Sequence, residues 1–311
     1  MKRETLIGMA VAAAFGASCW SMGASTTSSR PADEPSPNAS TTSATPKPSS
    51  STTAPTSNTK MPETATNKGY FKNLASDFVQ PTDDAGKLLL REYGSLFVAR
   101  GGAIPPKKVV FKDESDVLAF QNATAHRVAI IGGKSIDLQT PAITALENAV
   151  KDAKSAKLTI TPRGGDPARR SYKQTVINWN GRVKKGFEVW VGKGKVSAAE
   201  ARRISSLSPY EQVPEIFKLE SQKIYFALNQ EKSIIYSVAP PGTSQHIAML
   251  ALDVEEFGNP KVRSILAKHG WFQTIASDLP HFTFIGVSES ELPALGLKKV
   301  GDGQVFWVPD I

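Results

Sequence analysis

The residues best suited to chemistry are a histidine and an aspartate seven positions apart, in the segment 241–254 (PGTSQHIAMLALDV). Aliphatic residues at alternate positions near its end predict a strand that presents Asp253 beside the small Ala251. Because an odd separation puts two residues of one strand on opposite faces, His246 and Asp253 can share a metal only if His246 lies in the preceding turn, which Pro, Gly, Thr and Ser permit. The alternative is a turn histidine and a solvated carboxylate with no joint role.

A second cluster lies in segment 277–286 (SDLPHFTFIG), where His281 opens a predicted strand and Asp278 lies three residues earlier, across a turn. Two histidines and one aspartate, with water as fourth ligand, form a set that zinc accepts in open catalytic sites. The candidate set is therefore His246, Asp253 and His281. Asp278 is an additional carboxylate, which metal-assisted hydrolysis needs as general base.

These residues together resemble motifs of the VanY-type D-alanyl-D-alanine carboxypeptidases, zinc peptidases of the hedgehog/lysostaphin-like fold. The family pattern S-x-H-x-x-G-x-A-x-D matches residues 244–253 at its Ser, His, Ala and Asp positions. The pattern E-x-W-H places its acid and histidine at 278 and 281, and Y-R-S-Y-x-x-Q is approximated by residues 169–174 (RRSYKQ). The three motifs occur in the family's order and cover roughly residues 142–287.

The resemblance implies an exported zinc carboxypeptidase that hydrolyses the terminal D-Ala-D-Ala bond of peptidoglycan stem peptides. It implies zinc on the three candidate ligands, Asp278 as catalytic base, and substrate binding by Arg170, Ser244 and Gln174. Arg170 and Ser244 would hold the terminal carboxylate of the substrate. A fixed guanidinium and a hydroxyl can select a free C terminus, which separates a carboxypeptidase from an endopeptidase.

The sequence departs from the family pattern at Met249 in place of Gly, at Asp278 in place of Glu and at Pro280 in place of Trp. Aspartate is one methylene shorter than glutamate, and a displacement of about 1 Å can slow a reaction on the order of 100-fold. One alternative is therefore a cell-wall peptide-binding protein with impaired catalysis. Another is a peptidoglycan endopeptidase with the same zinc site.

The periodicity of apolar residues predicts an α+β fold, a small antiparallel sheet with helices packed on one side and the zinc cleft on the sheet. The predicted helices are 142–156, 168–178 and 261–269, and the predicted strands are 128–131 (buried), 158–160, 223–238, 248–254 and 281–287. We expect residues 136–311 to form the carboxypeptidase-like core, with an insertion at about 180–235. Residues 69–135 are expected to be an N-terminal extension.

Other candidate sites fail on spacing. Gly132-Gly133-Lys134-Ser135 follows a strand, but Val128 stands where a phosphate-binding loop needs glycine. His126 has no partner motif and is expected in a loop. His269 is expected to close a helix, with Gly270 as the cap.

Residues 1–24 have the composition of a signal peptide, with Lys2 and Arg3 before an uncharged run at 6–17 that is too short to span a bilayer. Cys19 follows Gly-Ala-Ser, a small-residue context that makes it a candidate for lipidation and membrane anchoring. The alternative is cleavage near Ala24, which discards Cys19. Either form predicts export to the periplasm or cell envelope.

Residues 25–68 are rich in Ser, Thr and Pro and contain no Leu, Ile, Val or aromatic residue, so we expect a disordered linker. The whole chain of 311 residues carries a net charge of +8, and residues 69–311 hold 31 Lys and Arg against 25 Asp and Glu. No window interleaves these cations with aromatic residues, so we expect no nucleic-acid partner. Anionic polymers of the cell envelope are the expected electrostatic partners. The single cysteine excludes an internal disulfide.

Overall fold

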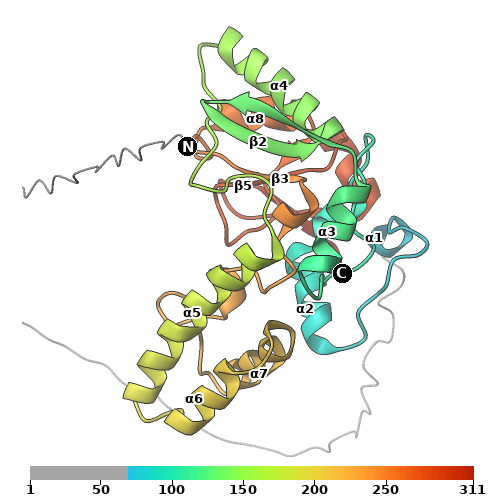
Figure 1. The fold of residues 1–311 in the computed structure, drawn as a ribbon. Helices are drawn as coiled ribbons and strands as arrows, with labels where there is room; N and C mark the ends of the chain where they lie inside the picture. The colour runs from blue at the N-terminus through green and yellow to red at the C-terminus, as the bar shows by residue number, and fades with distance from the viewer. Residues whose placement is uncertain (1–68) are drawn as a thin grey trace, which may run out of the picture. The chain divides into compact units, whose positions relative to one another are not determined.

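Helices and three small antiparallel sheets make up residues 69–311, the part of the chain that this computed structural model describes (Figure 1). The α-helices are α1 (Gly69–Lys72), α2 (Asp84–Tyr93), α3 (Glu114–Ala123), α4 (Thr140–Ser155), α5 (Tyr172–Gly192), α6 (Ala198–Ser205), α7 (Pro209–Ser221) and α8 (Pro260–Lys268). The 3₁₀ helices are η1 (Gly94–Val98), η2 (Ile234–Tyr236), η3 (Gln245–Ala248) and η4 (Glu289–Leu295). The strands are β1 (His126–Ile131), β2 (Lys134–Gln139), β3 (Ala251–Asp253), β4 (Trp271–Phe272), β5 (His281–Phe284), β6 (Leu297–Val300) and β7 (Phe306–Pro309). The predicted α+β class is confirmed, but the strands form three sheets in place of the single expected one.

The sheet that matters for the site has the order β3–β5–β4, with both pairs antiparallel. Leu252 and Phe282 are directly opposite each other in β3 and β5, and both are buried in the hydrophobic core. Side chains alternate across a strand, so the neighbouring residues of β3 and β5 point to the other face. That face carries Asp253 and His281.

The β1–β2 hairpin packs against α4, and α4 in turn contacts α8. The predictions of helices at 142–156 and 261–269 and of a strand at 128–131 are confirmed. The prediction that this strand is buried is wrong, because Val128 and Ile130 are 56% and 71% exposed. A two-stranded ribbon covered on one face turns only alternate residues to the core, and here Ile131 is buried and Ala129 half-buried.

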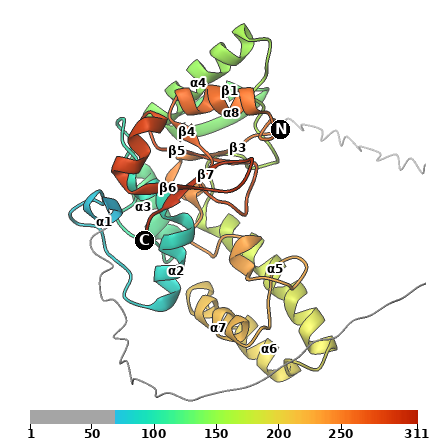
Figure 2. The same ribbon diagram turned by 180° about the vertical axis from the view of Figure 1, so that it is seen from behind.

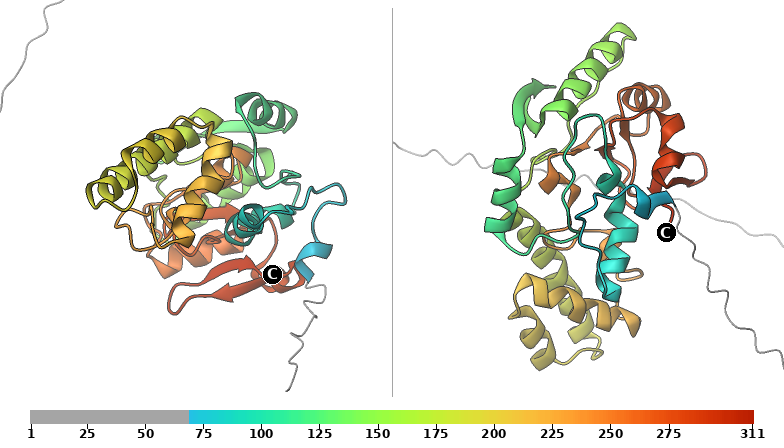
Figure 3. Two further views of the ribbon diagram at one scale, coloured as in Figure 1. Left: turned by 90° about the horizontal axis from the view of Figure 1, so that it is seen from below. Right: turned by 90° about the vertical axis from the view of Figure 1, so that its right-hand side faces the viewer.

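Helices α5, α6 and α7 gather at one end of this part of the chain, and α4 and α8 lie at the other (Figures 1 and 2). The helix predicted at 168–178 begins later, because the Ser171 side chain accepts the Gln174 backbone N–H as a cap, and it continues to Gly192. The insertion expected from about 180 therefore starts inside α5. Helix α2 contacts α7, so these helices are tied to the N-terminal elements (Figure 3).

Two predicted strands are absent from the described residues. Residues 223–238 form turns and η2, because the buried carboxylate of Glu220 accepts the backbone N–H groups of Phe226 and Ile234 that a sheet would otherwise pair. Residues 158–160 are irregular, and the nearest pairing is an isolated bridge between Pro162 and Val254. Neither segment forms a ladder, and in 223–238 the fully buried residues are sequence neighbours, Phe226–Ala227 and Ile234–Ile235.

The expected boundary at 135/136 falls inside β2. Residues 69–311 lie within one compact unit, and N-terminal residues such as Tyr93 belong to the same core as the central sheet. The expected signal peptide, Cys19 and the linker at 25–68 lie outside the described residues. None of the described helices combines the length and the apolar character needed to cross a bilayer.

Candidate metal centre

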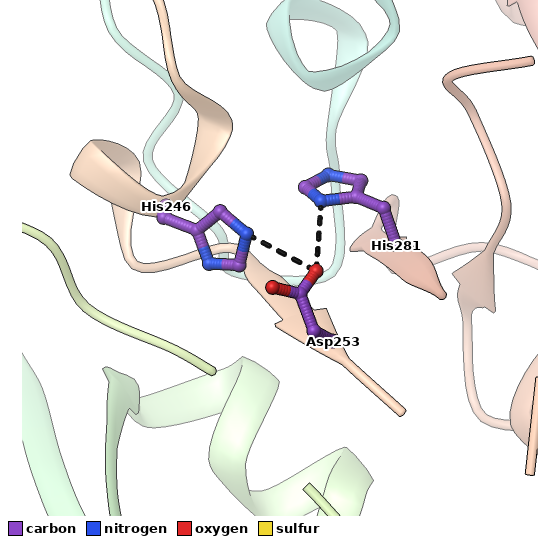
Figure 4. Close-up of side chains that lie close together, drawn as sticks. All are labelled: His246, Asp253 and His281. Carbon is purple, nitrogen blue, oxygen red and sulfur yellow. Dashed lines mark ion pairs between the residues drawn. The ribbon is translucent and has the colours of Figure 1, made fainter. Parts of the chain in front are cut away.

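Three side chains from separate positions in the sequence converge on one point beside the central sheet. The Oδ1 atom of Asp253 lies 3.3 Å from Nε2 of His246 and 3.3 Å from Nδ1 of His281. Figure 4 shows both imidazole rings turned toward the Asp253 carboxylate. The potential ligand atoms of the three residues all lie within 4.8 Å of one another, and both histidines are buried.

Strand register brings Asp253 and His281 together, since they are direct partners in the antiparallel β3–β5 pair. Opposite residues in such a pair point to the same face, with Cβ atoms about 4.5–5.5 Å apart. His246 arrives from the 3₁₀ helix η3, just before β3. His246 therefore lies outside the strand. Its odd separation from Asp253 requires this if both residues are to face one metal.

The turn between η3 and β3 is made by Met249, which adopts the left-handed conformation with φ 55° and ψ 32°. Its backbone N–H donates to the His246 carbonyl, and its carbonyl accepts from Gln139 N–H. Upstream, Gly242 has φ 78°, and a Cβ there would lie 1.9 Å from the Phe111 carbonyl oxygen. Glycine is thus required at 242, whereas hydrogen bonds hold the turn at 249.

Hydrogen bonds fix the protonated nitrogen of each histidine. Nδ1 of His246 lies 2.7 Å from the Ala168 carbonyl oxygen, which can only accept, so Nδ1 carries the proton. Nε2 of His281 lies 2.9 Å from Oε1 of Gln245, and the Gln245 amide is itself oriented by donation from Nε2 to the Tyr93 carbonyl at 2.9 Å. The remaining nitrogen of each ring therefore presents a lone pair to Asp253.

Three acceptors thus face one another with no proton among them. His246 Nε2 and Asp253 Oδ1 are both buried without a hydrogen-bond partner in the described residues. Buried polar atoms without partners are costly, and a cation would satisfy all three acceptors at once. Tetrahedral bonds of about 2.0–2.2 Å require ligand atoms about 3.3–3.6 Å apart, which both 3.3 Å separations meet. The group can therefore hold a metal ion.

The protonation states suit metal binding. Burial lowers the pKa of His246 to about 4, with Asp253 opposing and Arg170 reinforcing this shift. Burial acts to raise the pKa of Asp253, but His246 and His281 together hold it well below its ordinary value. A neutral imidazole and an ionised carboxylate at neutral pH are the forms that bind metals.

Arg170 contacts the candidate ligands directly. Its Nη2 donates to Asp253 Oδ2 at 2.9 Å, and its Nε donates to the Asp166 carbonyl. The loop that carries Arg170 is pinned along β3, because Asp253 N–H donates to the Pro167 carbonyl and the Asp253 carbonyl accepts from Arg163 N–H. The Arg170–Asp253 pair leaves Oδ1 free to face the histidines.

A cavity of about 350 Å³ opens beside the ligands and is lined by His246, His281, Arg170, Ser244 and Asp278, among others. Four of the predicted site residues therefore share one cavity with Asp278. Asp253 lies behind them, paired with Arg170. Gln174 does not line this cavity. It is half-buried in the first turn of α5.

Asp278 is exposed to solvent on the side of the cavity. The protein atoms around it desolvate its carboxyl and raise its pKa, an effect that His281 opposes and Asp253 reinforces. Two tight turns carry it there, since Asp278 N–H donates to the Ile275 carbonyl and His281 N–H donates to the Asp278 carbonyl. The turn thus delivers the shorter acid to the same cavity as the histidines.

The sequence motifs do not include the residues that orient the ligands and line the far end of the cavity, above all Gln245, Tyr93, Asn178 and Arg182. The only signal for Gln245 was its position next to His246. The expectation that His126 lies in a loop is wrong: it begins β1, with Nδ1 2.7 Å from Asp137 Oδ1. His269 does cap α8, as expected.

No protein-family model matches the chain, and no curated protein matches it.

Proposed function

We propose that this chain is an exported zinc-dependent carboxypeptidase that hydrolyses the terminal D-Ala-D-Ala bond of peptidoglycan stem peptides. The observation that carries the proposal is the convergence of His246 Nε2, His281 Nδ1 and Asp253 Oδ1 with no proton among them. A cavity that also contains an unligated carboxylate, Asp278, opens beside these atoms. Ligand atoms, open space and a base are the parts that metal-assisted hydrolysis requires.

Zinc is the metal that the donor set favours. Two imidazole nitrogens and one carboxylate oxygen, with a fourth position left for water or substrate, are typical of catalytic zinc sites. When bound, zinc would polarise the scissile carbonyl and lower the pKa of a water molecule toward neutrality. The carbonyl of Ala168 and the amide of Gln245 would keep the two imidazoles in the ligand tautomer.

Asp278 would accept the proton of the attacking water and pass it to the leaving amine. Its carboxylate makes no hydrogen bond or ion pair within residues 69–311, so it is free to take a proton. The raised pKa brings it closer to the operating pH, where general acid and base catalysis is most efficient. Its exposure on the cavity lets it contact substrate directly.

Arg170 and Ser244 would bind the terminal carboxylate of the substrate. Both line the cavity, and Ser244 precedes η3, the short helix that carries His246. Arg170 uses Nη2 and Nε within the protein, which leaves its Nη1 for the substrate. Gln174 lies outside the cavity, in the first turn of α5.

The turn at Met249 also supports the proposed family. The carboxypeptidase pattern has glycine at this position, and glycine is the residue that adopts positive φ most easily. Met249 has φ 55°. The backbone at 249 therefore has the conformation that the motif glycine would favour, although the side chain differs.

The proposed location follows from the sequence alone. The signal peptide at 1–24 would direct export to the periplasm or cell envelope, and lipidation of Cys19 would anchor the chain to a membrane. The linker at 25–68 would let the folded part reach peptidoglycan.

The test combines metal analysis with product analysis. The purified protein is assayed for bound zinc by mass spectrometry and for D-alanine release from a peptide ending in D-Ala-D-Ala, with chelator and after zinc is restored. We expect about one zinc per chain and zinc-dependent release. His246→Ala should abolish both, and Asp278→Asn should abolish release while zinc remains bound. His269→Ala is the matched control, because His269 also pairs with a carboxylate, Asp152, but lies away from the cavity.

Two outcomes would replace the proposal. Zinc binding and peptide binding without release of any amino acid would favour the cell-wall peptide-binding protein, a reading that the shorter acid at 278 favours. Cleavage of internal bonds in cross-linked muropeptides, with no D-alanine released, would favour the endopeptidase. Absence of zinc, with no effect of His246→Ala on metal content, would refute the metal site itself.

A further inference from the structure

The cavity beside the candidate ligands extends along α5 to Asn178 and Arg182, beyond the residues of every motif that the sequence shows. The two residues are four positions apart, so they lie on the same face of the helix, one turn from each other. Another part of the cavity wall is a strap, residues 235–239, which begins inside η2. The hydroxyl of Tyr93 holds the strap by donating to the Ile235 carbonyl at 2.7 Å.

The charges that line the cavity are not balanced. Apart from the histidines, its charged residues are Arg170, Arg182 and Asp278. Arg170 is paired with Asp253, at 2.9 Å. Arg182 has no hydrogen bond or ion pair in the described part of the chain, and its Nε atom is buried without a partner. An unpaired guanidinium that faces a cavity has free donors for an anionic ligand group, and the planar arrangement of these donors matches a carboxylate.

Helix geometry gives the distance of this group from the reaction. Arg170 lies two residues before α5, and Arg182 lies ten residues after its first residue, Tyr172. At 1.5 Å per residue, Arg182 is about 15 Å further along the helix axis than Tyr172. Helical side chains lean toward the N terminus, which shortens the gap to the metal ligands. An extended peptide advances about 3.3–3.6 Å per residue, so two to about four residues span it.

We infer that Arg182, together with the Asn178 amide, binds a second carboxylate of the peptide substrate, two to about four residues from the scissile bond. The inference rests on the proposed peptidase function and specifies its substrate as an anionic peptide. The carboxylate has two sources. It is either an acidic residue on the amino side of the scissile bond or the terminus of a peptide that continues on its carboxyl side.

Two pairs of peptides separate these sources. The first pair is Ac-Ala-Glu-Ala-D-Ala-D-Ala and its Gln counterpart, which differ in one carboxylate on the amino side. The second pair is Ac-Ala-Gln-Ala-D-Ala-D-Ala-Gly-Gly as free acid and as amide. Dissociation constants are measured by calorimetry with the zinc-loaded full chain, in an Asp278→Asn background that prevents turnover. Arg182→Gln is compared with Lys185→Gln, which removes one charge from an exposed position of the same helix outside the cavity.

We expect the acid of one pair to bind about 10- to 100-fold more tightly than its neutral partner, the range of a charge-assisted hydrogen bond. Arg182→Gln should abolish that preference, Arg182→Lys should restore part of it, and Lys185→Gln should leave it intact. Equal binding within both pairs, or a preference that survives Arg182→Gln, overturns the inference. An Arg182-dependent preference in a protein that releases no D-alanine refutes the hydrolase and leaves the anion site standing. Release of D-alanine without any such preference supports the hydrolase and refutes the anion site.

Discussion

Gln245 offers the sharpest test of the metal centre, because it touches a proposed ligand but cannot bind the metal itself. Its Oε1 accepts from His281 Nε2 at 2.9 Å and from the hydroxyl of Thr283, and its Nε2 donates to the Tyr93 carbonyl at 2.9 Å. In Gln245→Leu the side chain keeps a similar volume and loses these bonds. The Thr283 hydroxyl retains Thr274 at 2.6 Å. His281 Nε2 has no other partner in the described residues, whereas the Tyr93 carbonyl also accepts the first backbone hydrogen bond of η1, whose N-cap is Tyr93.

Two effects follow, and their magnitudes can be separated. One buried polar group without a partner, His281 Nε2, costs about 1–3 kcal/mol, so the metal-free variant should lose about that much unfolding free energy. In addition, a proton on His281 Nε2 is no longer stabilised by a hydrogen bond to residue 245. The proton can move to Nδ1, where Asp253 Oδ1 lies 3.3 Å away, and it then occupies the ligand position. Loss of such an orienting contact lowers metal affinity about 10- to 100-fold.

The assay measures zinc affinity by competition with a chromophoric chelator at neutral pH, and stability by denaturant titration with excess chelator. Gln212→Leu is the matched control, because Gln212 is a buried amide that accepts from Trp179 Nε1 at 2.6 Å and donates to the Ile204 carbonyl, within the α5–α7 helices. Both variants should be destabilised, and only Gln245→Leu should lose zinc affinity. Equal zinc affinity in the two variants would refute the assignment of Nδ1 of His281 as a ligand atom.

Three further predictions follow from the electrostatics and packing. The folded-state pKa of His246 is about 4 against an unfolded value near 6.5, so the metal-free protein should lose up to about 3 kcal/mol of stability as pH falls from 6.5 to 4; a denaturation midpoint that is constant over this range would contradict it. Burial raises the pKa of Glu220, so stability is lost as pH rises through its folded-state value; Glu220→Gln, which can keep all three hydrogen bonds, should be more stable than the parent at pH 7.5 and not at pH 4, measured by urea titration. Gly186→Ala places a Cβ 2.2 Å from the Phe226 ring and should lower stability by about 1–3 kcal/mol, whereas Gly181→Ala, on the same helix in open space, should raise it by about 0.5–1 kcal/mol; thermal melts that rank the pair otherwise would refute the packing of α5 on residue 226.

The elements that the sequence predicted well have strong periodicity and little dependence on distant partners. Helices α4 and α8 show apolar residues at helical spacing and were placed to within two residues at each end. The failures lie where alternation in the sequence does not correspond to a strand. Residues 223–238 bury two pairs of sequence neighbours, Phe226–Ala227 and Ile234–Ile235, and Glu220 takes the backbone donors that a strand partner would have used. Nothing in the local sequence distinguishes a paired strand from this arrangement of turns.

The candidate ligands could be found from sequence because histidine is scarce, with four in the whole chain, and two of them lie close to aspartates. Their orientation could not be found, because it depends on groups without a sequence signature, such as the Ala168 carbonyl and the amide of Gln245. The direct pairing of Asp253 with His281 is likewise a matter of register between strands 28 residues apart. Spacing within one segment carries no information on that register.

Met249 shows why a mismatch with a motif is weak evidence against a site. As a sequence feature it replaces a glycine and argues against the turn that the motif needs. A methionine at φ 55° is strained by roughly 1–2 kcal/mol relative to a helical or extended residue. The turn persists because its N–H and carbonyl are both hydrogen-bonded, to His246 and Gln139, and because its side chain is fully buried. Burial of a methionine side chain is worth about 1.5–3 kcal/mol, which is enough to offset the strain. The position of His246 therefore depends on contacts made by residue 249 and does not require the conformational freedom of glycine.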